Sequence, residues 1–189
     1  ALFLITTPRA DEKSKSDCYP ITTADLIKLD APKFSQYPAK PEKIIHPAPL
    51  NLKSNRIAKL FRTALRRGLS EGPNFAGHYT VVGIGSGTGC CAIAVVDGKT
   101  GNVATPDSFK FTSNIVLDAD DFEPSANTDY WGLRFRLDSR LLIVLGSLDE
   151  EHPREGAFYF IMDKGRLKPI FEAKVKKHYC DELSHDSGR

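Results

Sequence analysis

The spacing of hydrophobic residues along the chain changes near residue 77. Before it, one segment has an apolar residue at every third or fourth position, and this spacing predicts an amphipathic helix over Asn55–Leu69. The apolar positions of this helix are Ile57, Leu60, Phe61, Ala64 and Leu65. After residue 77 the apolar residues alternate or run together, as they do in strands.

Capping residues flank two predicted helices. Ser54 is a suitable N-cap for the long helix, and Gly68 with the Gly72-Pro73 pair is expected to end it. A shorter helix is expected over Ala24–Leu29, with Thr22-Thr23 as its cap.

Beyond residue 77, β-branched and aromatic runs alternate with turn residues, and this pattern predicts strands. Strands are expected at 78–82, 91–97, 102–105, 109–117, 131–137, 141–146, 157–162 and 167–171. Short turns at Gly98–Gly101 and Asp163–Arg166 favour antiparallel pairing. We therefore expect an α+β domain: a mostly antiparallel β meander of about seven strands, with blade-like hairpins and one amphipathic helix packed on it.

Five prolines between Ala31 and Pro49 exclude a long helix or a central strand there. This segment is expected to wrap the domain surface in an extended form, and a disordered linker is the alternative. Its expected anchors are Phe34, Tyr37 and Ile44-Ile45.

The ends of the chain differ from its middle. An apolar run at residues 1–5, followed by small and then charged residues, is typical of the end of a secretory signal. We expect a residual signal or disordered N-terminus over 1–17, one globular domain over 18–180 and a flexible tail over 181–189. The expected location is periplasmic or secreted. The alternative interpretation of the N-terminal apolar run is an edge strand or a loose terminus.

Composition narrows the class of protein. The 189 residues carry a formal net charge of +2, which gives no overall attraction to nucleic acid. No other apolar run approaches the ~18 residues that span a bilayer, so membrane insertion is not expected. Of the four cysteines, Cys18 and Cys180 are the expected disulfide, although four cysteines allow three pairings.

A glycine-rich run over residues 83–89 is the most unusual feature of the sequence. A strand follows it, whereas a phosphate-binding glycine run opens a helix, so no nucleotide cofactor is expected. The candidate binding residues lie on or near this run: Asn74, His78, Gly85, Ser86, Gly87 and Thr88. The alternative for Asn74 and His78 is structural, as a turn cap and a histidine bonded within the sheet.

The same region supplies the candidates for catalysis. A nucleophile at Ser86, Cys90 or Cys91 would need a base, and His78 on the preceding strand is the candidate. The alternative is structural, because cysteines are among the most buried residues.

One stretch of the chain resembles a known group. The runs Phe61-Arg-Thr-Ala-Leu-Arg-Arg-Gly and Gly72-Pro-Asn-Phe-Ala-Gly-His-Tyr are similar to segments of uncharacterised, mostly exported bacterial proteins, which continue into a Gly-Cys-Gly-Thr-Gly-Cys loop. The resemblance extends over about Arg56–Ile170 and implies export, but no activity. Ser86 stands where the group has its first loop cysteine, whereas Cys90 keeps the second.

Charged residues are segregated along the chain. Asp118, Asp120 and Asp121 lie in an acidic loop, where a calcium site is the alternative to simple solvation. The predicted long helix has no acid between Lys53 and Ser70. Its outer face is a solvated surface or a contact surface for an acidic partner. The basic residues in question are Lys53, Arg56, Lys59, Arg62, Arg66 and Arg67.

These patterns favour an exported, non-enzymatic binding module, such as an inhibitor or immunity-type protein, whose partner is another protein. An envelope structural protein fits the same sequence features. The alternative is a small Cys/His- or Ser/His-dependent hydrolase with its site at the glycine-rich run.

Overall fold

A computed structural model of the protein describes residues 21–85, 90–106, 112–113, 132–148 and 154–174. Eight strands form an antiparallel sheet in the order β1-β2-β4-β6-β7-β8, with β3 paired to β2 and β5 paired to β6. The strands are β1 (Tyr79–Gly85), β2 (Cys90–Asp97), β3 (Val103–Ala104), β4 (Thr112–Ser113), β5 (Leu133–Phe135), β6 (Leu141–Leu148), β7 (Arg154–Asp163) and β8 (Arg166–Lys174). The expected class, α+β and mostly antiparallel β, is confirmed.

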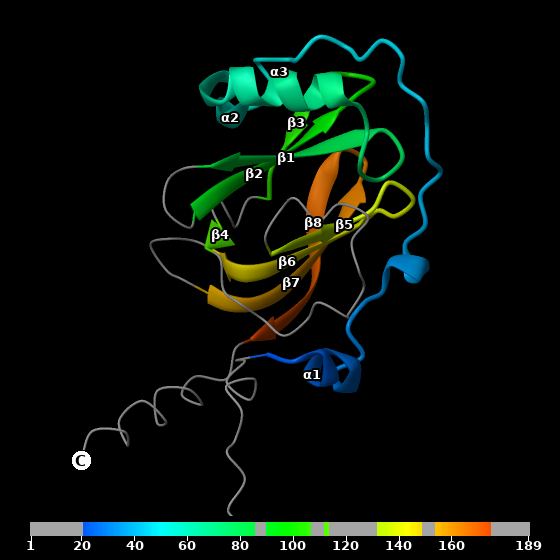
Figure 1. Ribbon diagram of the computed structural model, residues 1–189, viewed down its shortest axis with the longest axis vertical. Helices are drawn as coiled ribbons and strands as arrows, with labels where there is room; N and C mark the ends of the chain where they lie inside the picture. Colours follow the sequence, from blue (N-terminus) through cyan, green and yellow to red (C-terminus); the bar gives the residue numbers. More distant parts are fainter. Residues whose placement is uncertain (1–20, 86–89, 107–111, 114–131, 149–153, 175–189) are drawn as a thin grey trace, which may run out of the picture.

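The sheet consists of two parts. One part contains β1, β2 and β3, and the other contains β5 to β8; the two-residue strand β4 pairs with both β2 and β6. Apolar side chains on the facing surfaces of the two parts form one shared core (Figure 1). It includes Val81, Ile93, Val95, Phe135, Leu142, Val144, Phe158 and Phe160.

Both outer faces of the sheet are also covered. Val82, Ala94 and Val96 of β1 and β2 pack beneath a helical pair, whereas Leu141, Ile143 and Tyr159 of β6 and β7 pack beneath the N-terminal segment. All eight residues of β6 are buried as a result. A strand covered on both faces has no polar side, which explains why its sequence is apolar apart from Ser147.

The predicted long helix is two helices, α2 (Arg56–Leu60) and α3 (Arg62–Glu71), which meet at Phe61. The N-cap of α2 is Asn55, whose side chain accepts a 2.9 Å hydrogen bond from the backbone N–H of Ala58. The predicted cap, Ser54, instead donates to the Asn51 carbonyl and accepts from the Val103 N–H.

The helix ends at Gly72 (φ +94°), as expected, but Gly68 does not end it. Gly68 lies within α3, and a Cβ there would come 2.5 Å from a methyl group of Val82. The missing side chain therefore lets α3 approach β1 closely.

The short N-terminal helix is confirmed as α1 (Thr23–Lys28). Thr22 and Asp25 form a capping box, in which each side chain bonds the backbone N–H of the other. Leu26 of α1 and Phe34 of the 3-10 helix η2 (Phe34–Gln36) are buried against the outer face of β6 and β7.

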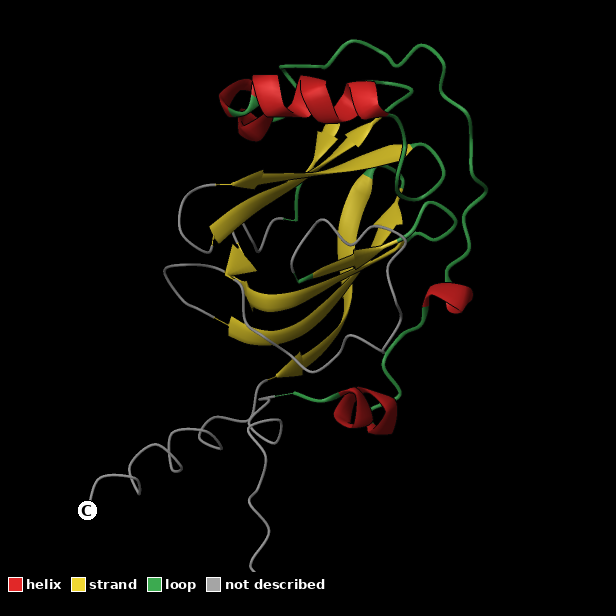
Figure 2. Cartoon of the chain, viewed as in Figure 1, coloured by secondary structure: helices red, strands yellow, loops and turns green. Residues whose placement is uncertain are grey.

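The proline-rich segment is extended and wraps the domain surface, as predicted (Figure 2). We call residues 37–51 the strap, and five backbone hydrogen bonds of 2.8–2.9 Å fix it. Two of these bonds join the strap to the residues before β6, as the pairs Tyr37–Arg140 and Ala39–Asp138. The other three join it to glycines beside β1 and β2, as the pairs Glu42–Gly77, Ala48–Gly98 and Asn51–Gly101. Of the expected anchors, Phe34 is buried, but Ile45 is 70% exposed and anchors nothing.

Within the part of the chain that the structure describes, no helix is long and apolar enough to cross a membrane.

Two glycines with similar backbone angles allow a test of strap packing. Gly101 (φ +71°) lies so close to the strap that a Cβ would overlap the Pro49 carbonyl oxygen, whereas Gly165 (φ +75°) has open space around it. Gly165→Ala is expected to cost about 1–2 kcal/mol, the penalty of a left-handed L-residue. Gly101→Ala is expected to cost at least about 1 kcal/mol more, because the strap must also shift. Urea unfolding of both variants measures the difference, and equal costs would contradict tight strap packing.

Candidate functional site

Four ionisable side chains surround the start of β1. The ring of His78 lies between two carboxylates: its Nδ1 is 3.3 Å from Oε1 of Glu42, and its Nε2 is 3.6 Å from Oδ1 of Asp97. Lys99 reaches the same Glu42 carboxylate at 2.6 Å. We call Glu42, His78, Asp97 and Lys99 the ion cluster.

The ion cluster joins the strap to the β1–β2 hairpin. Glu42 belongs to the strap, His78 precedes β1, and Asp97 and Lys99 lie at the end of β2 and in the turn after it. The hydrogen bond from Lys99 is the main cause that lowers the pKa of Glu42, while partial desolvation opposes it. Asp97 also accepts hydrogen bonds from the Lys99 N–H and the Thr100 hydroxyl, each 2.8 Å long.

Both ring nitrogens of His78 therefore face carboxylates that other groups already hold. This arrangement is suited to fastening a surface segment, because Glu42 belongs to the strap. Among the described residues, no group of three or more His, Cys, Asp or Glu side chains is arranged to hold a metal ion.

Asn74 has a structural role in the same region. Its amide oxygen accepts from the Val81 N–H at 2.8 Å, and its amide nitrogen donates to the Val81 carbonyl at 3.2 Å. Phe75 follows it and is fully buried. The side chain of Asn74 thus continues the hydrogen bonding along the edge of β1, and both of its polar atoms bond to Val81.

The structure does not bring His78 together with the glycine-rich run. His78 precedes β1, whereas Gly85 ends β1 and pairs with Cys91 of β2. A seven-residue strand is roughly 20 Å long at ~3.3 Å per residue. The proposed pairing of His78 with Cys90 or Cys91 therefore has no geometric support, because side chains cannot bridge that distance.

Several predicted site residues lie outside the described residues. They are Ser86, Gly87 and Thr88 of the glycine-rich run, Asp118, Asp120 and Asp121 of the acidic loop, and the expected disulfide partners Cys18 and Cys180. The calcium site and the disulfide stay predictions.

A hollow of about 340 Å³ lies against β7 and β8. Its lining includes Phe158 and Phe160 of the shared core, and its charged residues, Arg154 and Glu172, form an ion pair of 3.2 Å. The hollow therefore offers a ligand an apolar wall, but its charged side chains are already occupied with each other.

The outer surface of α2 and α3 is strongly basic, as predicted. Six exposed basic residues, which we call the basic face, lie on it: Lys53, Arg56, Lys59, Arg62, Arg66 and Arg67. Among the described residues, Arg67 alone of the six has a carboxylate within ion-pair distance, at 3.4 Å from Glu71. Leu60 lies within the basic face and is 63% exposed. An exposed large apolar residue among cations is a feature that helical periodicity did not reveal.

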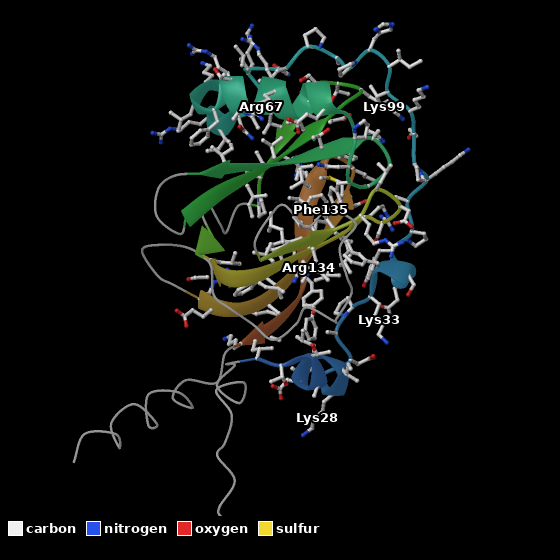
Figure 3. All side chains as sticks on the ribbon, viewed as in Figure 1. Lys28, Lys33, Arg67, Lys99, Arg134 and Phe135 are labelled. Atoms are coloured by element: carbon white, nitrogen blue, oxygen red, sulfur yellow. The ribbon has the colours of Figure 1, made fainter. Side chains whose placement is uncertain are left out.

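The basic face and the ion cluster lie on the same end of the molecule. In Figure 3, Arg67 lies on α3 at the top, Lys28 lies at α1 at the opposite end, and Lys33 lies between α1 and η2. Lys99 lies near the strap at the upper right. The basic face and the ion cluster are therefore on the end of the molecule that carries β1, β2 and β3.

No protein-family model matches this chain, and neither the curated proteins nor the solved structures include one with significant similarity to it. The resemblance to exported bacterial proteins therefore stays a prediction, and the site is interpreted from its geometry.

The lowered pKa of Glu42 predicts an acid-sensitive attachment of the strap. Its folded-state pKa is below the ordinary value of 4.5, so the ionised carboxylate stabilises the fold above about pH 4.5. That contribution is lost as the pH falls through the lower, folded-state value. We expect Glu42→Gln to be less stable than the wild type at neutral pH, and the gap to close in acid. Urea titrations from about pH 3 to pH 7 measure this difference in the free energy of unfolding.

The neighbouring exposed strap residue Lys43 provides the control. Lys43→Gln removes one charge nearby without touching the ion cluster, so its effect on stability is expected to change much less over the same acid range. A gap for Glu42→Gln that does not depend on pH would contradict the assigned role of the carboxylate.

Proposed function

We propose that this protein is an exported, non-enzymatic binding module that docks another protein against the basic face. One observation carries the proposal: five of the six exposed cations on α2, α3 and the preceding turn have no carboxylate partner among the described residues. Cations that are not internally neutralised attract an acidic surface and accelerate its encounter.

The packing of α3 supports this proposal. Leu65 and Leu69 are buried beneath the helix, and Gly68 lets it sit close to Val82. These contacts fix the inner side of α3 and thereby hold its outward cations in a defined spacing. A rigid surface loses little conformational entropy on binding, which favours tight association.

An exposed apolar residue gives the basic face a second property of protein interfaces. Leu60 is 63% exposed between Lys59 and Arg62. Interfaces between proteins combine a central apolar contact with charged residues around it. A partner that covers Leu60 gains apolar burial in addition to charge pairing.

An inhibitor or immunity-type role is consistent with such a surface, because a protein of this kind acts by covering a partner's site. Export is the part of the proposal that rests on the N-terminal sequence pattern, which lies outside the described residues. The hydrolase alternative is less well supported, because His78 is engaged at the end of β1 opposite to Gly85.

Charge reversal of the basic face tests the proposal. The double variant Arg62→Glu/Arg66→Glu is expected to weaken partner binding at least about tenfold, or about 1.4 kcal/mol, because it replaces attraction by repulsion. The immobilised protein captures its partner from periplasmic or culture fractions of the source cells, and mass spectrometry identifies it. Titration of that purified partner then gives the affinities at low and raised salt.

The matched control is Lys28→Glu/Lys33→Glu, which makes the same change in net charge at the other end of the molecule (Figure 3). It is expected to bind like the wild type. Equal weakening by both double variants would mean that net charge alone matters, and unchanged binding by the variant of the basic face would refute the proposed surface.

A further inference from the structure

The hollow against β7 and β8 adjoins the shared core. Phe158 and Phe160 of β7 line the hollow and also belong to that core. Side chains alternate along a strand, so Arg154 lies on the same face of β7 as these two rings. Glu172 of β8 pairs with Phe158 and shares that face. The hollow is therefore mainly apolar, with charged groups at one end.

An irregularity in β8 lies at the hollow. Tyr159 pairs with Phe171 and Phe160 pairs with Pro169, so Ile170 is an extra residue without a partner on β7. An extra residue of this kind bends a strand and re-aims a side chain, and such bulges are frequent beside functional sites. Ile170 lines the hollow and is 37% exposed. The bulge thus gives the hollow an apolar rim.

The charged groups of the hollow neutralise each other. Nη1 of Arg154 donates to Oε2 of Glu172 at 3.2 Å. The Arg154 guanidinium also lies over the Phe158 ring, 5.5 Å from its centroid. A charged ligand would have to compete with this ion pair for one of its members, whereas an uncharged ligand leaves the pair intact. The hollow therefore favours a ligand without net charge.

The size of the hollow limits the size of a ligand. Its volume is about 340 Å³, which lies within the range of small-molecule sites, roughly 300–1,000 Å³. A closed apolar cavity of ~150 Å³ holds one benzene molecule. The hollow is more than twice as large, so it has room for a molecule of about two or three rings.

We infer that this hollow binds an uncharged, largely apolar small molecule of that size. The aromatic and aliphatic lining provides the contact, and the internal ion pair disfavours a charged ligand. This function goes beyond the docking of a protein at the basic face and does not depend on it, because the hollow lies on β7 and β8 and the basic face on α2, α3 and the preceding turn.

A small molecule fits this region better than an added strand from another protein. β8 is the last strand in the order of the described sheet. It contains Pro169, which has no N–H to donate, and its exposed side chains include Lys168, Glu172 and Lys174. Proline and charged residues on an edge strand disfavour pairing with another chain. A ligand in the hollow does not use this edge.

Two fluorescent dyes with a shared skeleton serve as ligands in the test. N-phenyl-1-naphthylamine is uncharged, and 8-anilino-1-naphthalenesulfonate carries an added sulfonate. The wild type is expected to bind the uncharged dye at one saturable site, at least about tenfold more tightly than the sulfonate binds there, because the sulfonate would lose hydration without a free partner. Fluorescence titration measures both affinities.

Matched variants assign the binding to the hollow. Ile170→Lys places a charge on its rim and is expected to weaken binding of the uncharged dye at least about tenfold. Ile27→Lys makes the same change on α1, where Ile27 is 61% exposed, and is expected to bind the dye like the wild type. Urea unfolding checks that both variants fold.

A third variant tests the role of the ion pair. Glu172→Gln leaves the Arg154 guanidinium without its carboxylate, so the sulfonate dye is expected to bind roughly threefold more tightly than to the wild type. Binding of the uncharged dye is expected to stay nearly the same. This exchange of preference would not follow from a general loss of stability.

The contrary outcomes are distinct. Unchanged binding of the uncharged dye by Ile170→Lys, or an equal loss in Ile27→Lys, refutes the site. Tighter binding of the sulfonate than of the uncharged dye at this site in the wild type refutes the class of ligand. Dimerisation of the wild type that Ile170→Lys abolishes, without saturable dye binding, would overturn the inference in favour of a second copy of the chain. None of these results bears on the basic face.

Discussion

The attachment of the strap to the sheet is the constraint on which the rest of the structure depends. Its first two bonds reach residues 138–140, next to β6, and the following three reach Gly77, Gly98 and Gly101 beside β1, β2 and β3. The strap therefore spans the two parts of the sheet. The two residues of β4, the shared core, and hydrogen bonds from Ala76 and Gly77 to residues 136–139 also link these parts. Proline suits this role because it keeps a chain extended and removes donors that would need partners.

The same attachment shapes the surface at the end of α3. The ion cluster fixes Glu42 of the strap beside His78, and Ile44, Ile45 and Pro47 then form one wall of a small pocket there. Leu69 and Ser70 of α3 also line this pocket. His78, which the sequence suggested as a catalytic base, contacts the strap through Glu42.

The sequence predicted the elements more successfully than the site. Helical spacing, strand runs and the proline-rich segment identified α3, the strap and the sheet, because each depends on local preferences. The break at Phe61 and the cap at Asn55 were missed, since Ser54 is also a good cap residue and only its bonds to Asn51 and Val103 show that it is used elsewhere. The closeness of α3 to Val82 explains Gly68, which a single sequence presents as a helix terminator.

His78 lies away from the glycine-rich run for a physical reason. Asn74, His78 and Gly85 are close in sequence, but a strand separates its two ends by its full length. The partners of His78 are 36 residues before it, at Glu42, and 19 residues after it, at Asp97. Neither Glu42 nor Asp97 lies in a sequence motif whose spacing would reveal its contact with His78. The basic face was predictable, because its residues share one short segment, whereas the small pocket at the end of α3 needs three distant segments to meet.

Native-state hydrogen exchange of the strap amides tests the central claim most directly. If the strap is an integral part of the folded sheet, the amides of Glu42, Ala48 and Asn51 open with nearly the same free energy as that of Val144 in β6. They also open together, in one cooperative unit. Fast exchange of the three strap amides, while Val144 stays protected, would contradict the account, because the strap would then be a loosely attached covering of an independently stable sheet.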